Sequence, residues 1–326
     1  MLPYLQQQQG QDTLAMNSLH PHVQNVLGCI VLLLIIATIV TTVLSKLKGT
    51  DKYRELVLRV QTWWILVGVF SVAMMAPTKV AVGFFGFVSF LALKEYFSMI
   101  PTRRADRRVI FWAYLSIPLQ YYWVADAWYG LFIIFIPVYM FLFIPMRVIL
   151  IGDTKGYLQA IGTIHWGLMT TVFCISHLAY LLVLPESVNP NGGGVGLVLC
   201  VTFLSQFNDV AQYFWGKLFG KHKVVPTVSP NKTYQGLIGG VLTTVTTAYF
   251  LGPYLTPLNA YYSAIGGLII GLFGFIGDVT ISALKRDVGL KDSSQLLPGH
   301  GGILDRVDSL YFTVPLFFHY LYYLKY

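Results

Sequence analysis

The chain has 326 residues, of which 56% are hydrophobic and only 11% are charged. About 25% of the residues of a typical soluble domain are charged, so this composition excludes a soluble protein and predicts an integral membrane protein. In such a protein the net charge of +8 reports membrane topology, and we expect no nucleic-acid partner.

The apolar runs predict an all-α fold, a polytopic helix bundle with about 8–10 transmembrane helices of about 20 residues each. Residues 1–22 form a polar, Gln-rich tail without Lys or Arg, which differs from a secretory signal. We expect residues 23–326 to form a single transmembrane domain. With ten spans, the predicted positions are roughly 24–45, 61–77, 80–100, 109–125, 127–146, 157–184, 195–216, 235–251, 258–278 and 307–324.

The positions of the basic residues support this count. Of the 22 Lys and Arg residues, 19 fall in segments 46–59, 103–108, 147–155, 217–232 and 285–306. Ten spans place all five segments on one side of the membrane. Basic connections stay in the cytoplasm, so the sequence predicts that this side is cytoplasmic.

The segment 282–308 contains four basic and four acidic residues in a chain that is otherwise poor in charge. If the preceding helix continues, Asp278, Ser282 and Lys285 share one helix face. Asp305 and Asp308 are three residues apart at the start of the last span. We expect Asp278, Asp305 and Asp308 to converge on Mg²⁺, with one or two metal ions bound, because a divalent cation offsets their mutual repulsion.

A Gly-rich loop separates these two acidic stretches. Gly301 and Gly302 allow close approach to a ligand, and backbone N–H groups before a helix favour phosphate. Fixed positive charge is available on Lys285, Arg286, Lys291 and Arg306. Carboxylates, cations and amide donors together predict a site for a nucleoside triphosphate.

A second polar block precedes the first along the chain. Asp209 lies inside an apolar run, where a charge is costly unless it has a function. The basic loop that follows can hold phosphates or a lipid headgroup, and its candidate residues are Lys217, Lys221, Ser229, Lys232 and Thr233. The Gly spacing of a P-loop is absent before Lys232.

Simpler interpretations stay open for single residues. Asp305 could be only a helix cap, and Asp278 could form a structural ion pair with Lys285 or Arg286. Lys291 could be an interfacial anchor, His300 a turn residue, and the basic loop a plain consequence of topology. Intramembrane acids also mark ion or proton transport, although a transporter does not require the Gly-rich cationic loop.

The segment from Ser282 to Asp308 resembles the sequence pattern of the CDP-diacylglycerol synthases, also called phosphatidate cytidylyltransferases. The matching stretches are Ser282-Ala-Leu-Lys285-Arg286, Lys291-Asp292, Ser294 and Pro298-Gly-His300-Gly301-Gly302-Ile-Leu-Asp305-Arg306-Val-Asp308. The block Ser229-Pro-Asn-Lys232-Thr233-Tyr-Gln-Gly resembles a second pattern of that family. The resemblance covers residues 200–310 most strongly.

This resemblance implies an Mg²⁺-dependent enzyme that joins CTP and phosphatidate, releases pyrophosphate and works in a lipid membrane. It implies metal ligation by Asp278, Asp305 and Asp308, and phosphate binding by Lys285 and Arg286. With Arg306, Ser282 and His300, those two are the candidate catalytic residues. The candidate substrate-binding residues are Lys217, Lys221, Ser229, Lys232, Thr233, Lys291, Gly301, Gly302 and Asp209.

The resemblance also implies a homodimer, and we expect a bacterial inner membrane with the site facing the cytoplasm. Two alternatives are kept. One is a CTP-dependent transferase that acts on another lipid phosphate, and the other is a non-enzymatic membrane transporter.

Overall fold

The computed structural model describes residues 19–326 apart from 49, 104–105, 153 and 295–300. The described residues form long helices, and the one β contact among them is an isolated bridge between Lys223 and Thr233. Two helical units contain a π-helical segment. In chain order the elements are α2 (Pro21–Lys48), α3 (Thr50–Met75), α4 (Thr78–Met99), α5 (Arg107–Ala125), α6–η1–α7 (Tyr129–Ile134, Phe135–Met140, Phe141–Ile149) and α8–η2–α9 (Tyr157–Leu168, Met169–Cys174, Ile175–Val183). They are followed by the short 3-10 helix η3 (Glu186–Val188), α10 (Gly193–Phe219), α11 (Tyr234–Leu255), α12 (Ala260–Asp287) and α13 (Leu304–Lys325).

Eight of these units are long and apolar enough to cross a membrane, counted over the described part of the chain. The two long units outside that set are α5 and α13. The prediction of an all-α, polytopic membrane bundle is therefore confirmed. Large apolar side chains on α2 are exposed, among them Leu32, Leu33 and Ile39. Such a surface suits contact with lipid.

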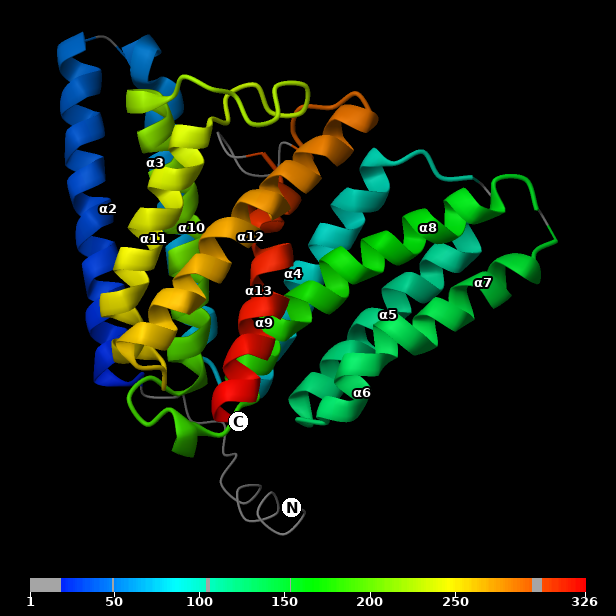
Figure 1. Cartoon of the computed structure of the whole chain (residues 1–326). Coiled ribbons are helices and arrows are strands. Elements are labelled where there is room, and N and C mark those ends of the chain that lie inside the picture. The colour runs from blue at the N-terminus through cyan, green and yellow to red at the C-terminus, as the bar shows by residue number, and fades with distance from the viewer. Residues whose placement is uncertain (1–18, 49, 104–105, 153, 295–300) are drawn as a thin grey trace.

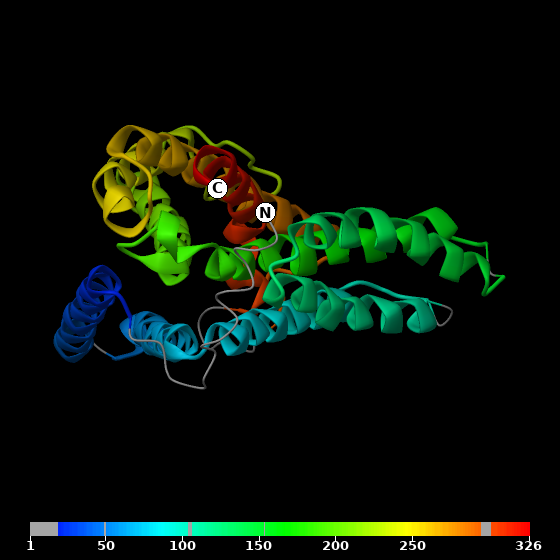
Figure 2. The ribbon, with the colours of Figure 1, turned by 90° about the horizontal axis from the view of Figure 1, so that it is seen from below.

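The helices form two groups. In Figure 1 and in the view from below in Figure 2, α10, α11, α12 and α13 lie together, while α5, α6, α7 and α8 extend to one side. The α9 helix contacts α4, α5, α10 and α13 and so joins the two groups. The buried core runs through both, with fully buried side chains such as Phe132, Leu181, Leu197 and Phe318.

Glycines allow the helices of the first group to approach closely. A Cβ at Gly271 of α12 would lie 3.2 Å from the Val241 Cα of α11. A Cβ at Gly277 would collide with the backbone of Asp308 and lie 3.3 Å from the Cα of Ser309 on α13. Small residues at helix contacts permit such packing within membranes. The contact at Gly277 brings the neighbouring Asp278 to the start of α13.

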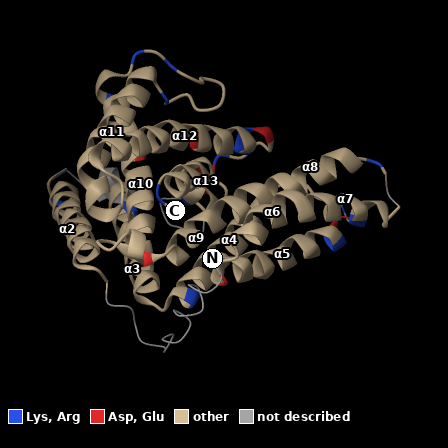
Figure 3. Cartoon of the chain, turned by 60° about the horizontal axis from the view of Figure 1, so that its bottom comes forward, with Lys and Arg blue, Asp and Glu red and all other residues tan. Residues whose placement is uncertain are grey.

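Charged residues gather where the helices end. Figure 3 shows Lys and Arg mainly in connections and at helix ends. In Figure 1 the α10–α11 connection and the C-terminal end of α12 lie at the upper side, away from the C-terminus of the chain. Three elements that carry predicted site residues, α10, α12 and α13, therefore meet near one end of the bundle.

Candidate functional site

The last turns of α12 carry the first group of predicted site residues. Asp278, Ser282 and Lys285 follow one another at helical spacing, and Ser282 Oγ donates a hydrogen bond to Asp278 Oδ1 at 3.3 Å. Lys285 Nζ donates a hydrogen bond to Asp305 Oδ1 of α13 at 2.6 Å. This face of α12 is thereby directed toward the start of α13.

The Asp305 carboxylate is buried and saturated with hydrogen-bond donors. Besides Lys285 on Oδ1, its Oδ2 accepts from Ser293 N and Ser293 Oγ, both at 2.9 Å, and from Gly302 N at 3.1 Å. An ionised carboxylate has about four lone-pair positions. Asp305 therefore organises the loop that leads into α13.

A second group of acids lies beside this pair. Asp209 of α10, Asp278 of α12 and Asp308 of α13 all interact with the Lys232 ammonium, which forms an ion pair with Asp278. Asp209 Oδ2 accepts a hydrogen bond from Ser309 Oγ at 2.7 Å. We call Asp209, Asp278 and Asp308 together with Lys232 the carboxylate cluster.

Lys232 is held in its charged form by these neighbours. Burial lowers the pKa of Lys232, but the carboxylates of Asp278, Asp209 and Asp308 raise it, and the pKa lies above its ordinary value. The group is therefore protonated at neutral pH. It supplies one positive charge to a site that has three carboxylates.

The expected convergence of Asp278, Asp305 and Asp308 on Mg²⁺ stays a prediction. Asp305 differs from the other two in its partners, because Lys285 and the loop donors contact its oxygens. Asp209 takes the third place in the carboxylate cluster. Among the described residues, no three His, Cys, Asp or Glu side chains are already arranged to hold a metal ion.

The donor chemistry of the carboxylate cluster nevertheless fits a hard cation. Asp209 Oδ1 is buried and has no hydrogen-bond partner among the described residues. All donors there are carboxylate oxygens, which Mg²⁺ prefers.

Of the predicted residues in the basic loop between α10 and α11, only one lies in the carboxylate cluster. That residue is Lys232. Thr233 is buried and caps α11, since its Oγ1 accepts a hydrogen bond from Gly236 N at 3.1 Å. Ser229 is half-buried, and Lys217 and Lys221 are exposed.

The remaining predicted cations differ in their surroundings. Arg286 donates to Val228 O at 3.3 Å and to Leu290 O at 3.0 Å, so it braces the α10–α11 loop against the end of α12. Lys291 is exposed. Arg306 acts electrostatically on Asp308 and Asp209, and its Nε is buried without a hydrogen-bond partner among the described residues. His300 lies outside the described residues.

The two described glycines of the Gly-rich loop make room for carboxylates of the protein itself. Gly301 has φ 79°, and a Cβ there would lie 3.2 Å from Asp305 Cγ. A Cβ at Gly302 would lie 2.7 Å from Glu95 Cδ, on α4. The glycines predicted to approach a ligand are thus also needed to fold the loop around Asp305 and Glu95.

We expect Gly302→Ala to lower the melting temperature in detergent. Crowding in a packed interior costs typically about 1–3 kcal/mol. Gly68→Ala is the matched control, because nothing lies within 4 Å of a Cβ at that helical position. If Gly302→Ala and Gly68→Ala had the same melting temperature, the result would contradict the tight packing of the loop.

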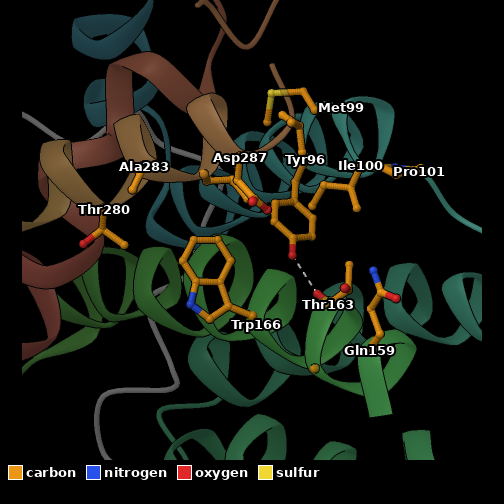
Figure 4. A pocket seen from close by; sticks show the side chains of 13 residues that line it. Tyr96, Met99, Ile100, Pro101, Gln159, Thr163, Trp166, Thr280, Ala283 and Asp287 are labelled. Carbon is orange, nitrogen blue, oxygen red and sulfur yellow. Dashed lines mark hydrogen bonds between the residues drawn. The ribbon is translucent and has the colours of Figure 1, made fainter. Parts of the chain in front are cut away.

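A cavity of about 700 Å³ lies on the opposite face of α12 (Figure 4). It is bounded by Tyr96 of α4, Trp166 of α8 and Thr280 and Asp287 of α12, among others. No predicted site residue that the structure describes is among those that line it. The α12 helix therefore separates this cavity from the carboxylate cluster.

The sequence interpretation missed Glu95 and Ser293. Both contact the loop before α13, and Ser293 Oγ bonds to Glu95 Oε2 and Asp305 Oδ2. A signal for Glu95 was available, because a carboxylate inside a long apolar run requires a partner. Its partner Ser293 is about 200 residues away in the sequence, and helical spacing predicts contacts only between residues of the same helix.

The chain is similar to known proteins over most of its length. Residues 57–324 match the model of the cytidylyltransferase family. The Escherichia coli K12 protein YnbB, described as uncharacterized, is 46% identical over 294 residues, which cover 90% of this chain and 96% of YnbB. Phosphatidate cytidylyltransferases from Staphylococcus epidermidis and Staphylococcus aureus (strain COL) are 34% and 37% identical over 154 and 155 residues. Each alignment covers 47% of this chain and 59% of the staphylococcal enzyme.

Proposed function

The chain belongs to the cytidylyltransferase family, and we propose that it transfers the cytidylyl group of CTP to phosphatidate, giving CDP-diacylglycerol and pyrophosphate. The family resemblance seen in segment 282–308 is thereby confirmed, and the chain is a nucleotidyltransferase. Its family implies a nucleoside triphosphate and a lipid phosphate as substrates. The observation that carries the finer proposal is the carboxylate cluster beside the Lys285–Asp305 pair.

In the proposed reaction the phosphate of phosphatidate is the nucleophile. An oxygen of that phosphate forms a bond to the α-phosphorus of CTP, and the bond from this phosphorus to the pyrophosphate oxygen breaks. No Ser or Cys nucleophile is required. The protein must hold two anions in line and offset the charge of the transferring group.

The chain supplies cations and carboxylates for these tasks. In this proposal Arg306, whose Nε has no hydrogen-bond partner among the described residues, and Lys232 neutralise phosphate oxygens. Asp209, Asp278 and Asp308 would hold Mg²⁺, which when bound supplies charge neutralisation for the triphosphate. Lys285 and Asp305 keep the start of α13 in position.

The location of the site suits both substrates. CTP is water-soluble, whereas phosphatidate keeps its phosphate at the membrane surface. Helix ends next to basic connections can meet both molecules. We propose a bacterial inner membrane with the site on the cytoplasmic side. The homodimer stays a prediction from the family resemblance.

Labelled CTP tests the proposed reaction directly. Membranes that contain the chain are incubated with CTP labelled at the α-phosphate and with phosphatidate. We expect label in CDP-diacylglycerol, and matched membranes without the chain serve as the control. Label only in another lipid, such as a polyprenyl product, would favour the alternative acceptor, and no labelled lipid would favour transport.

Metal removal gives a second test. We expect a chelator to abolish label transfer and added Mg²⁺ to restore it, because the carboxylates outnumber the Lys232 ammonium in the cluster. The same assay with the chelator already saturated by Ca²⁺ controls for nonspecific effects of the chelator. Full activity in the metal-free assay would contradict the proposed Mg²⁺ site.

A further inference from the structure

The Glu95 carboxylate of α4 joins the N-terminal half of the chain to the loop before α13. Its Oε2 accepts hydrogen bonds from Leu304 N at 2.8 Å and Ser293 Oγ at 3.2 Å. Its Oε1 accepts from Ile303 N at 3.0 Å and Ser294 Oγ at 2.8 Å. Glu95 is only 8% exposed, so these hydrogen bonds offset the cost of burying its carboxylate.

Glu95 caps a helix from outside. The first N–H groups of a helix have no partner within it, and the side chain of Ile303, at the N-cap position before α13, makes no capping hydrogen bond. Glu95 accepts the N–H groups of Ile303 and Leu304, where a negative charge is also favoured by the helix dipole. One carboxylate thus fixes the position and rotation of the first turn of α13.

That turn carries residues of the candidate site. Asp305 follows Leu304 directly, and Asp308 lies within the next turn in the carboxylate cluster. Ser293 Oγ bonds to both Glu95 and Asp305, so the two buried carboxylates share the loop between them. Any movement of Glu95 would therefore move Asp305 and Asp308 together.

We propose that Glu95 is a positioning residue for nucleotidyl transfer, which aligns Asp305 and Asp308 by holding the first turn of α13. The inference rests on the proposed function of the site. Glu95 does not touch the reacting groups, and acts through the turn that it caps. A displacement of about 1 Å in a catalytic site can lower a rate about 100-fold, so a large effect on turnover is expected.

The test uses Glu95→Ala and Glu95→Gln in the full-length protein, purified in detergent. Alanine removes all four acceptor contacts, while glutamine keeps the volume and one acceptor oxygen. We expect kcat per folded molecule to fall about 100-fold in Glu95→Ala and less in Glu95→Gln, with KM for CTP changing far less than kcat. Lys94→Ala is the control, since Lys94 is adjacent and exposed, and it should keep wild-type kcat.

Hydrogen exchange supplies a readout that needs no substrate. In both Glu95 variants we expect faster amide exchange in peptides that contain Ile303 and Leu304, and unchanged exchange in α10. Activity is measured with whichever lipid the wild-type chain labels from CTP, so a different acceptor does not affect the test. Wild-type kcat in Glu95→Gln and Glu95→Ala, or unchanged exchange at Ile303 and Leu304, would overturn the proposal. A wild-type chain that labels no lipid would overturn the proposed function itself, whatever the exchange data show.

Discussion

Replacing Asp278 by Asn is expected to lower the rate of cytidylyl transfer by about 10²–10³-fold or more, the typical cost of losing one electrostatic group that stabilises a transition state. Asp278 lies between two parts of the site. It forms the ion pair with Lys232 and accepts a hydrogen bond from Ser282. The asparagine keeps the volume but removes the charge that orients Lys232 and that would bind a cation. Initial rates with labelled CTP, normalised to folded protein, measure the effect.

Asp287→Asn is the matched control for Asp278→Asn. Asp287 is on the same helix, but it is exposed and borders the cavity on the opposite face of α12 (Figure 4). We expect its rate to stay at the wild-type level. Equal losses in both variants would indicate a general effect of charge on α12, and near wild-type turnover in Asp278→Asn would remove Asp278 from the proposed mechanism.

The helices were predictable because their signal is local. Most of the predicted spans are apolar runs of membrane-crossing length, and the positions of the basic connections were the basis for the expected number of crossings. The contacts made by residues near the helix ends were harder to predict from the sequence. The predicted span 80–100 agrees with α4, which ends at Met99, but the sequence did not show that Glu95 near this end meets donors on the loop before α13.

The membership of the site was predictable only in part. Helical spacing correctly places Asp278, Ser282 and Lys285 on one face. It also suggests that Asp305 and Asp308 point the same way, but it cannot say which neighbours each one meets. The folded loop supplies three donors to Asp305, and α10 supplies Asp209 to Asp308. These are contacts between distant segments, and local spacing contains no information about them.

Replacing Lys285 by Met is the second change with a large expected effect. Asp305 is buried and Lys285 is largely buried, with side-chain exposures of 6% and 11%, and Lys285 Nζ lies 2.6 Å from Asp305 Oδ1. Removing one partner of a buried ion pair costs about 3–5 kcal/mol. Asp305 keeps its bonds from Ser293 and Gly302, so we expect the lower end of that range, together with a large loss of transfer rate. Thermal unfolding in detergent and initial rates measure the two effects.

A double variant separates stability from catalysis at this pair. Lys285→Met with Asp305→Asn no longer buries an unpaired charge, so part of the lost stability should return. The rate should stay low, because the neutral pair cannot hold the loop and the start of α13 as the charged pair does. Lys291→Met is the control for stability, since Lys291 is exposed and its loss should change the melting temperature little. Recovery of both stability and rate in the double variant would show that the pair only avoids a buried charge and has no part in organising the site.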